Sequence, residues 1–336
     1  MTGASFARAP GKLFLLGEYA VLDGCPAVVA AVDRYVDVVV HPRESAMLRI
    51  EAAGYGDPAE WPLDELPDAS GYAFVLAAYR AVLARAPEFA GRGVELAITS
   101  QLAGGEGAKV GLGSSAAVTV ATVASLLRVA GRFPSREEIF EVAHGAHRAA
   151  QGGEGSGADV AASVYGGLVE FVPRAGDVPA VRALPIPSDL ELLAAWTGEA
   201  SATVGLVRRY RSLANGHSEA RGRFVAASAA AVREFVAALE RGGSSLQSLD
   251  ANGAALEELG AVLGGGVVTP ALARLVAVAR AHGINAKSSG AGGGDCGVAL
   301  TCDHAGAERL RAAWRAAGLL PLDLHISRTG VSHGRR

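Results

Sequence analysis

Apolar residues recur along the chain at two spacings, one typical of strands and one typical of helices. Short apolar runs bounded by Gly, Pro or Asp predict strands in the first half at 12–16, 34–40, 94–100 and 168–172. Apolar residues three and four positions apart predict a helix at 72–86. Ser135, followed by Glu138 in a capping-box pattern, opens another helix. This mixture predicts an α/β (α+β) fold.

Prolines interrupt the pattern near the middle of the chain, at positions 173, 179, 185 and 187, and mark the best candidate for a domain boundary. Beyond them we expect strands at 190–196 and 322–327, and helices at 223–240, 245–263, 270–282 and 308–317. The last residues, VSHGRR, we expect to be frayed. We therefore predict two domains, 1–175 and 176–336.

Composition narrows the class of partner. The chain has 336 residues, is half apolar and has 19% charged residues, which is typical of globular proteins with sizeable cores. A net charge of -3 gives no electrostatic reason to expect nucleic acid or a membrane surface, so a small metabolite is the better expectation. Three cysteines without metal-type spacing indicate neither a disulfide framework nor a zinc site. We expect a cytoplasmic monomer or homodimer without a signal peptide or transmembrane segment.

The stretch 109–131, KVGLGSSAAVTVATVASLLRVAG, predicts a glycine loop that enters a helix. Gly111 and Gly113 allow a ligand to approach the backbone closely, and the serines at 114 and 115 can cap the helix. The free N–H groups and the positive dipole end of such a helix form an anion site, and a triphosphate is the anion we expect. A P-loop is excluded because Lys109 precedes the glycines. The alternative interpretation is a glycine turn before a buried helix.

Two charged residues stand beside glycine or proline at the ends of predicted elements. Lys12 follows Pro10-Gly11 at the start of an apolar strand, where an ammonium group either reaches solvent or meets an anion. Asp159 lies at the head of a small-residue helix behind Gly157, where a carboxylate either supports the helix N-terminus or acts on a ligand. These residues alone leave both alternatives open.

Three glycine-bearing segments stand far apart in the chain. They are Pro10-Gly11-Lys12 with Gly17-Glu18-Tyr19, then Gly111-Leu112-Gly113-Ser114-Ser115-Ala116, then Ser289-Gly290-Ala291-Gly292-Gly293-Gly294. In this order they resemble the three motifs of the GHMP small-molecule kinases. The resemblance covers nearly the whole chain. It implies an N-terminal domain like domain 2 of ribosomal protein S5 and a ferredoxin-like C-terminal domain, with the active site in the crevice between them.

Within that family, the finer pattern resembles the phosphomevalonate kinase branch. Three segments carry this likeness. They are Gly155-Ser156-Gly157-Ala158-Asp159-Val160-Ala161, Trp196-Thr197-Gly198-Glu199-Ala200-Ser201, and especially Lys287-Ser288-Ser289 leading into Gly294-Asp295-Cys296. Mevalonate kinases usually have a His where this chain has Tyr19, and a metal-binding Glu where it has Arg148. The resemblance implies ATP-dependent phosphorylation of phosphomevalonate. The alternatives are another GHMP kinase, such as mevalonate kinase, and a non-catalytic metabolite sensor.

The resemblance also implies roles for particular residues. Asp159 would accept the proton of the acceptor phosphate, or only orient its oxygen, and Lys12 would offset the charge that develops. Ser115 would bind Mg²⁺, and the second magnesium ligand stays unassigned. The ATP phosphates would contact Lys109, Gly111, Leu112, Gly113, Ser114, Ser115 and Ala116. The acceptor would contact Glu18, Tyr19, Gly155, Ser156, Gly157, Ser201, Lys287, Ser289, Gly290, Ala291, Gly292 and Gly293, with Arg148, Arg208 and Lys287 as candidates for holding its phosphate.

Overall fold

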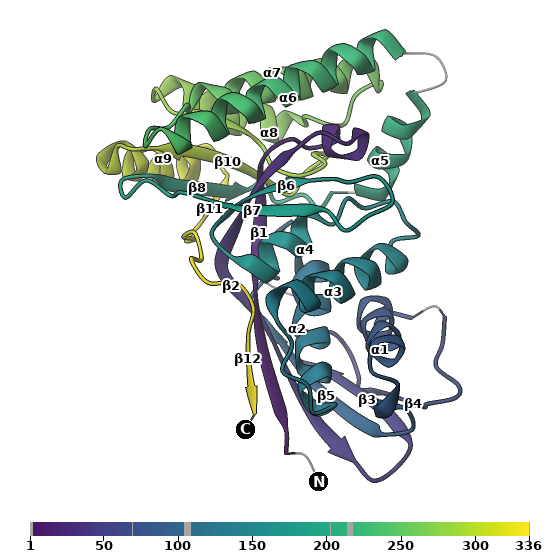
Figure 1. Cartoon of the computed structure of the whole chain (residues 1–336). Coiled ribbons are helices and arrows are strands. Elements are labelled where there is room, and N and C mark those ends of the chain that lie inside the picture. The colour runs from purple at the N-terminus through teal and green to yellow at the C-terminus, as the bar shows by residue number, and fades with distance from the viewer. Residues whose placement is uncertain (1–2, 69, 104–108, 202, 214–217, 336) are drawn as a thin grey trace.

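The structure is a computed structural model that describes residues 3–68, 70–103, 109–201, 203–213 and 218–335. Its strands form two sheets, and helices cover both of them (Figure 1). The long first strand runs through the middle of the molecule, and the last strand lies beside it. These two sheets and their helices position the candidate site.

The first sheet has eight strands and is antiparallel except for one pair. Its main path is β12-β1-β2-β5-β3-β4, and β6 and β7 extend from β2. The strands β3 and β5 run parallel, since the chain crosses back between them through β4 and a helix. The strands are β1 (Ser5–Leu16), β2 (Ala27–Arg43), β3 (Met47–Ala52), β4 (Ala59–Pro62), β5 (Gly93–Ser100), β6 (Leu168–Val172), β7 (Ala180–Leu184) and β12 (Ser332–Arg335).

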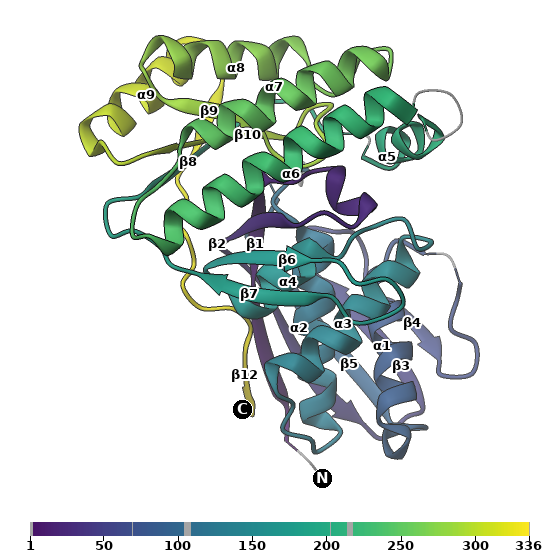
Figure 2. The same ribbon diagram turned by 45° about the horizontal axis from the view of Figure 1, so that its top comes forward.

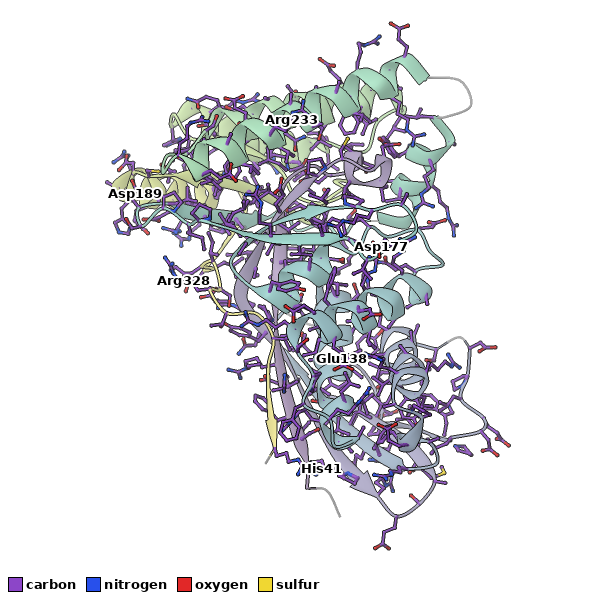
Figure 3. All side chains as sticks on the ribbon, viewed as in Figure 1. His41, Glu138, Asp177, Asp189, Arg233 and Arg328 are labelled. Carbon is purple, nitrogen blue, oxygen red and sulfur yellow. The ribbon has the colours of Figure 1, made fainter. Side chains whose placement is uncertain are left out.

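Four helices lie on one face of this sheet (Figure 2). They are α1 (Ala73–Arg85), α2 (Ser114–Val129), α3 (Arg136–Ala150) and α4 (Ala158–Tyr165), and the short 3₁₀ helices η1 (Ala20–Asp23) and η2 (Pro87–Phe89) add single turns. Helix α2 is almost wholly buried, because its Ala, Val, Leu and Thr residues suit an apolar environment on all sides. Helix α3 begins as predicted: the Ser135 hydroxyl accepts the backbone N–H of Glu138, labelled in Figure 3, at 3.2 Å.

The second sheet has four strands in the order β11-β8-β10-β9, and every pair is antiparallel. In chain order within this sheet that is 4-1-3-2, the ferredoxin-like arrangement, so this expectation is confirmed. Its strands are β8 (Glu191–Trp196), β9 (Asn285–Ser288), β10 (Cys296–Thr301) and β11 (Leu320–Leu322). The helices of this half are α5 (Thr203–Ser212), α6 (Ser218–Glu240), α7 (Gln247–Val262), α8 (Pro270–Ala281) and α9 (His304–Ala316).

A shared core joins the two sheets. Strand β8 alternates, so that Leu193 and Ala195 pack in the cluster formed with α8 and α9. Its other face, with Leu192 and Ala194, belongs to the core of the first sheet, which also takes in apolar residues of α6. Because apolar contacts continue from one half to the other, the loops at their junction are held in fixed relation.

The C-terminal segment differs from the prediction. Residues 332–335 are not frayed, since they form β12 and pair antiparallel with the start of β1. Their sequence, Ser-His-Gly-Arg, has no apolar alternation, so no pattern indicated a strand there. The strand expected at 322–327 is also wrong, because β11 ends at Leu322. Since β7 and β12 both belong to the first sheet, strand pairing crosses the predicted division after residue 175, which stays a prediction.

Candidate active site

The start of α2 has the open end expected of an anion site. Gly113 stands at the N-cap with a φ of 81°, and no side chain of the described residues caps the helix. The serine cap suggested by the sequence is therefore wrong, and the N–H groups of the first turn have no side-chain acceptor within the described chain. Ser114 is exposed and Ser115 is half-buried, so the serines of this turn face outward.

Lys12 lies directly against this turn. Its backbone N–H donates to Leu112 O at 2.8 Å, and its ammonium group donates to Gly111 O at 3.2 Å. A Cβ atom at Gly113 would lie 2.8 Å from Lys12 Cγ, closer than real side chains approach. Glycine is therefore needed at position 113 for two reasons: its φ is positive, and the side chain of Lys12 passes too close for a Cβ atom.

The charges around Lys12 come from separate elements. Burial lowers the pKa of Lys12, and the carboxylates of Asp159 and Asp295 oppose that effect by raising it. Lys109 acts in the same direction as burial. Asp159 on α4 is thus close enough to Lys12 for its charge to act on the ammonium group, so the two predicted catalytic residues face the same region.

Asp159 lies in the first turn of α4, which follows Gly157 with a φ of 81°. One oxygen, Oδ1, accepts the Val160 N–H at 3.0 Å. The other, Oδ2, lies 3.7 Å from Nε2 of His147 on α3. One carboxylate oxygen is therefore fixed by its own helix while the second faces the site.

The segment before α4 packs closely on α3. His144 Nε2 lies 3.2 Å from Ser156 O, and the Ser156 hydroxyl accepts the Ala158 N–H at 3.3 Å. A Cβ atom at Gly157 would lie 2.2 Å from His144 Cδ2, and one at Gly155 would meet the side chain of Gln151. These glycines let the chain pass close to α3 before it turns into α4.

The third glycine segment is joined to the turn after β1. The Lys287 ammonium forms an ion pair with the Glu18 carboxylate, with side-chain exposures of 0% and 2%. Ser289 Oγ donates to Phe14 O at 2.9 Å, and the Tyr19 hydroxyl donates to Ala291 O. These predicted acceptor-binding residues therefore contact one another across the two halves, and their binding role stays a prediction.

Asp295 links three loops, and no role for it was predicted from the sequence. Its Oδ1 accepts the Ser201 N–H at 2.9 Å, and its Oδ2 lies 3.7 Å from the Lys109 ammonium. Ser201 in turn donates its hydroxyl to Gly292 O and accepts from Lys109 through its backbone oxygen. Asp295 has a φ of 56°, which non-glycine residues rarely adopt. The sequence feature that could have indicated a role for Asp295 is its position directly after the glycine-rich run that ends at Gly294.

Gly111 and Gly293 complete this junction. A Cβ atom at Gly111 would lie 2.5 Å from Cβ of Asp295. One at Gly293 would lie 2.8 Å from a methyl group of Leu206 and 3.2 Å from Ser201 Oγ. The structure thus brings together the loop before α2, the loop before β10 and the segment before α5, as the predicted site requires. Residues 104–108 of the first loop lie outside the described residues.

His147 is a second residue without a predicted role. Its ring is fully buried and stacks on Phe74, with ring centroids 5.1 Å apart. Its Nε2 lies 3.2 Å from the hydroxyl of Ser115, the predicted magnesium ligand. Histidines are common near the ends of helices. The sequence therefore gave no indication that His147 contacts Ser115.

Two features are absent from the described residues. Histidine, cysteine, aspartate and glutamate side chains do not gather there in threes or more as a dedicated metal site would need. None of the helices in that part of the chain is long and apolar enough to cross a bilayer.

Fold and site define the class of protein. The model of the GHMP kinases N-terminal domain matches residues 73–167, and that of the GHMP kinases C-terminal domain matches residues 233–319. The chain belongs to the GHMP kinase family, has its two-domain fold and is an ATP-dependent kinase.

Two of the relatives most similar in sequence carry the names of mevalonate-pathway kinases. The chain is 36% identical to the phosphomevalonate kinase of Streptomyces sp. strain CL190, over 96% of this chain and 97% of that one. It is 31% identical to the mevalonate kinase of Pyrococcus horikoshii, over 97% and 96%.

Solved structures agree in fold over nearly the full length. The Lin0012 protein of Listeria innocua superposes with a TM-score of 0.88 at 27% identity, covering 98% of this chain and 99% of that one. The phosphomevalonate kinase of Streptococcus pneumoniae, solved with phosphomevalonate and AMPPNP, superposes with a TM-score of 0.80 at 24% identity and the same coverage. The predicted two-domain GHMP kinase fold is thereby confirmed.

Proposed function

We propose that the chain is a phosphomevalonate kinase, which converts (R)-5-phosphomevalonate and ATP into 5-diphosphomevalonate and ADP. The observation that carries this proposal is the 36% identity with a phosphomevalonate kinase over almost the whole of both chains. Mevalonate kinases match over the same length at 31%. Tyr19 and Arg148, which stand where mevalonate kinases usually have His and Glu, favour the same choice.

The transfer is a direct displacement at the γ-phosphorus. A bond forms between that phosphorus and an oxygen of the acceptor phosphate, the bond to the β,γ-bridging oxygen breaks, and ADP leaves. The N–H groups at the start of α2 hold the ATP phosphates. Lys12 lies at the same turn and offsets the charge that develops on the transferred group. Asp159 accepts the acceptor's proton or orients its oxygen.

Mg²⁺ fits the oxygen atoms beside this turn. The Ser115 hydroxyl and the Asp159 carboxylate are neighbours, since both face Nε2 of His147. Mg²⁺ is commonly bound by one or two protein oxygens together with substrate phosphates and water, so a larger cluster of acidic side chains is not required. When bound, it neutralises charge on the β- and γ-phosphates.

The acceptor's own phosphate needs a cation at the cleft. Of the three candidates, Lys287 is paired with Glu18 in the interior. Arg148 donates to Gly153 O at 3.3 Å. Arg208 on α5 contacts Glu154 just before α4, and its side chain is 70% exposed. Arg148 and Arg208 are both exposed, so either side chain can turn toward an incoming phosphate, whereas the buried Lys287 cannot.

The test is ADP release measured with purified protein, Mg²⁺·ATP and a panel of mevalonate, phosphomevalonate, galactose and homoserine. We expect the highest kcat/KM with phosphomevalonate. A higher value with mevalonate would make the chain a mevalonate kinase instead. ADP release with none of the four would favour a metabolite sensor, although such a sensor would not need to keep both Lys12 and Asp159.

A further inference from the structure

The imidazole of His147 lies between two groups that belong to different helices. Ser115 Oγ of α2 is 3.2 Å from His147 Nε2, which is a hydrogen-bond distance. Asp159 Oδ2 of α4 is 3.7 Å from the same nitrogen, which is an electrostatic contact. His147 itself comes from α3, so one ring atom relates all three helices at the point where the predicted metal ligand and the predicted base lie.

The surroundings of the ring favour one tautomer. Nδ1 is buried and has no hydrogen-bond partner among the described residues. A proton on Nδ1 would therefore be a buried donor without an acceptor, which is unfavourable. A proton on Nε2 has the Ser115 oxygen and the Asp159 carboxylate in front of it. The ring thus presents a donor to both.

We infer that His147 is a positioning residue for phosphoryl transfer. Its Nε2–H holds the Ser115 oxygen, so that the hydroxyl's remaining lone pair faces the phosphates and their cation. The same N–H draws Asp159 Oδ2 toward α2, while Oδ1 is fixed by the Val160 N–H. The inference rests on the proposed roles of Ser115 and Asp159, and it adds a residue that belongs to none of the three glycine motifs.

Burial and stacking limit how the ring can move. The His147 ring stacks on Phe74 with an interplanar angle of 28°, and its exposure is 0%. Because the ring is held in one orientation, its Nε2–H stays directed at Ser115 and Asp159, as a positioning group requires. If the ring served only to fill space, phenylalanine would replace it without effect on catalysis.

The central experiment compares His147→Phe with His147→Gln. Phenylalanine keeps the ring and the stacking on Phe74 but removes the donor, whereas glutamine can place an N–H near the position of Nε2. We expect His147→Phe to lower kcat about 10- to 100-fold, the usual effect of removing a partner that orients a ligand, and His147→Gln to recover most of it. Phe89→Leu is the control: it loosens aromatic packing against Tyr79 of the same half without touching His147, and we expect kcat close to the wild-type value.

A binding measurement supplies a readout that does not depend on turnover. We expect the affinity for AMPPNP in the presence of Mg²⁺, measured by calorimetry, to fall about 10-fold in His147→Phe. A double-mutant cycle with Ser115→Ala then shows whether the effect passes through the serine. We expect the double variant to bind no more weakly than Ser115→Ala alone.

Additive losses in the cycle, or wild-type kcat and binding in a folded His147→Phe, would overturn the inference. If His147→Phe does not fold, His147→Asn replaces it in the same binding titration, because its shorter amide cannot reach the position of Nε2. Wild-type affinity in His147→Asn would then refute the inference. The proposed substrate is tested separately: a wild-type protein that prefers mevalonate refutes the substrate assignment but leaves every comparison between His147 variants valid.

Discussion

The ion pair between Glu18 and Lys287 allows a quantitative prediction. Both side chains are at most 2% exposed, and the second oxygen of Glu18 has no hydrogen-bond partner among the described residues. Replacing Lys287 with Met leaves the carboxylate with only a long contact to the Gly290 N–H, 3.4 Å away. Removing one partner of a buried pair costs about 3–5 kcal/mol, because the other charge stays in a poorly solvated place.

The assay is urea unfolding followed by far-UV circular dichroism. We expect Lys287→Met to lower the free energy of unfolding by about 3–5 kcal/mol. At about 2–4 °C per kcal/mol this corresponds to a fall in Tm of roughly 6 to 20 °C. The double variant Glu18→Leu, Lys287→Met should regain most of the loss, since a buried pair replaced by apolar groups is often neutral or stabilising.

A matched control is the ion pair between Arg223 and Glu219 on the surface of α6, with side-chain exposures of 65% and 90%. Arg223→Met should change the free energy of unfolding by no more than about 0.5 kcal/mol. The reasoning is refuted if Lys287→Met costs less than about 1 kcal/mol. If that variant instead keeps its stability and raises the KM for the acceptor, Lys287 binds substrate, as the sequence resemblance implied.

Three further predictions concern the site. Asp159→Asn should lower kcat by about 100-fold or more while AMPPNP still binds, and a kcat near the wild-type value would exclude the proposed role. Gly113→Ala should lower kcat about 10- to 100-fold, since its Cβ would push against the Lys12 stem, and steady-state ADP release measures this. Burial lowers the pKa of His144, with the carbonyl of Ser156 opposing that effect. The folded protein therefore binds this proton less readily than the unfolded chain, so stability should fall as the pH drops below about 6.5, and His144→Phe should flatten that slope in urea titrations.

The regular elements followed from local physics and could be predicted. Ser135 and Glu138 define the start of α3 in the sequence, and the hydrogen bond is present in the structure. The glycine loop before α2 was also predicted, but only one of the two reasons for its glycines was. Gly111 and Gly113 allow close approach of Asp295 and Lys12, which are parts of the protein itself, as well as leaving the helix end open.

Partnerships between distant residues could not be predicted. Glu18 and Lys287 are 269 positions apart, and a sequence gives no means of telling that each satisfies the other's charge. The resemblance placed both among the residues that contact the acceptor. His147 was missed for a similar reason: its contacts with Ser115 and Asp159 exist only once three helices have packed.

The pairing of β12 with β1 has a consequence for synthesis of the chain. A ribosome makes β1 more than three hundred residues before its outer neighbour, Ser332–Arg335. Until then the outer edge of Ser5–Arg8 in β1 offers unpaired backbone groups to any other extended chain nearby. The start of β1 is thus exposed to mispairing until Ser332–Arg335 has been made, so folding of the first sheet is completed only by a strand from the other end of the fold.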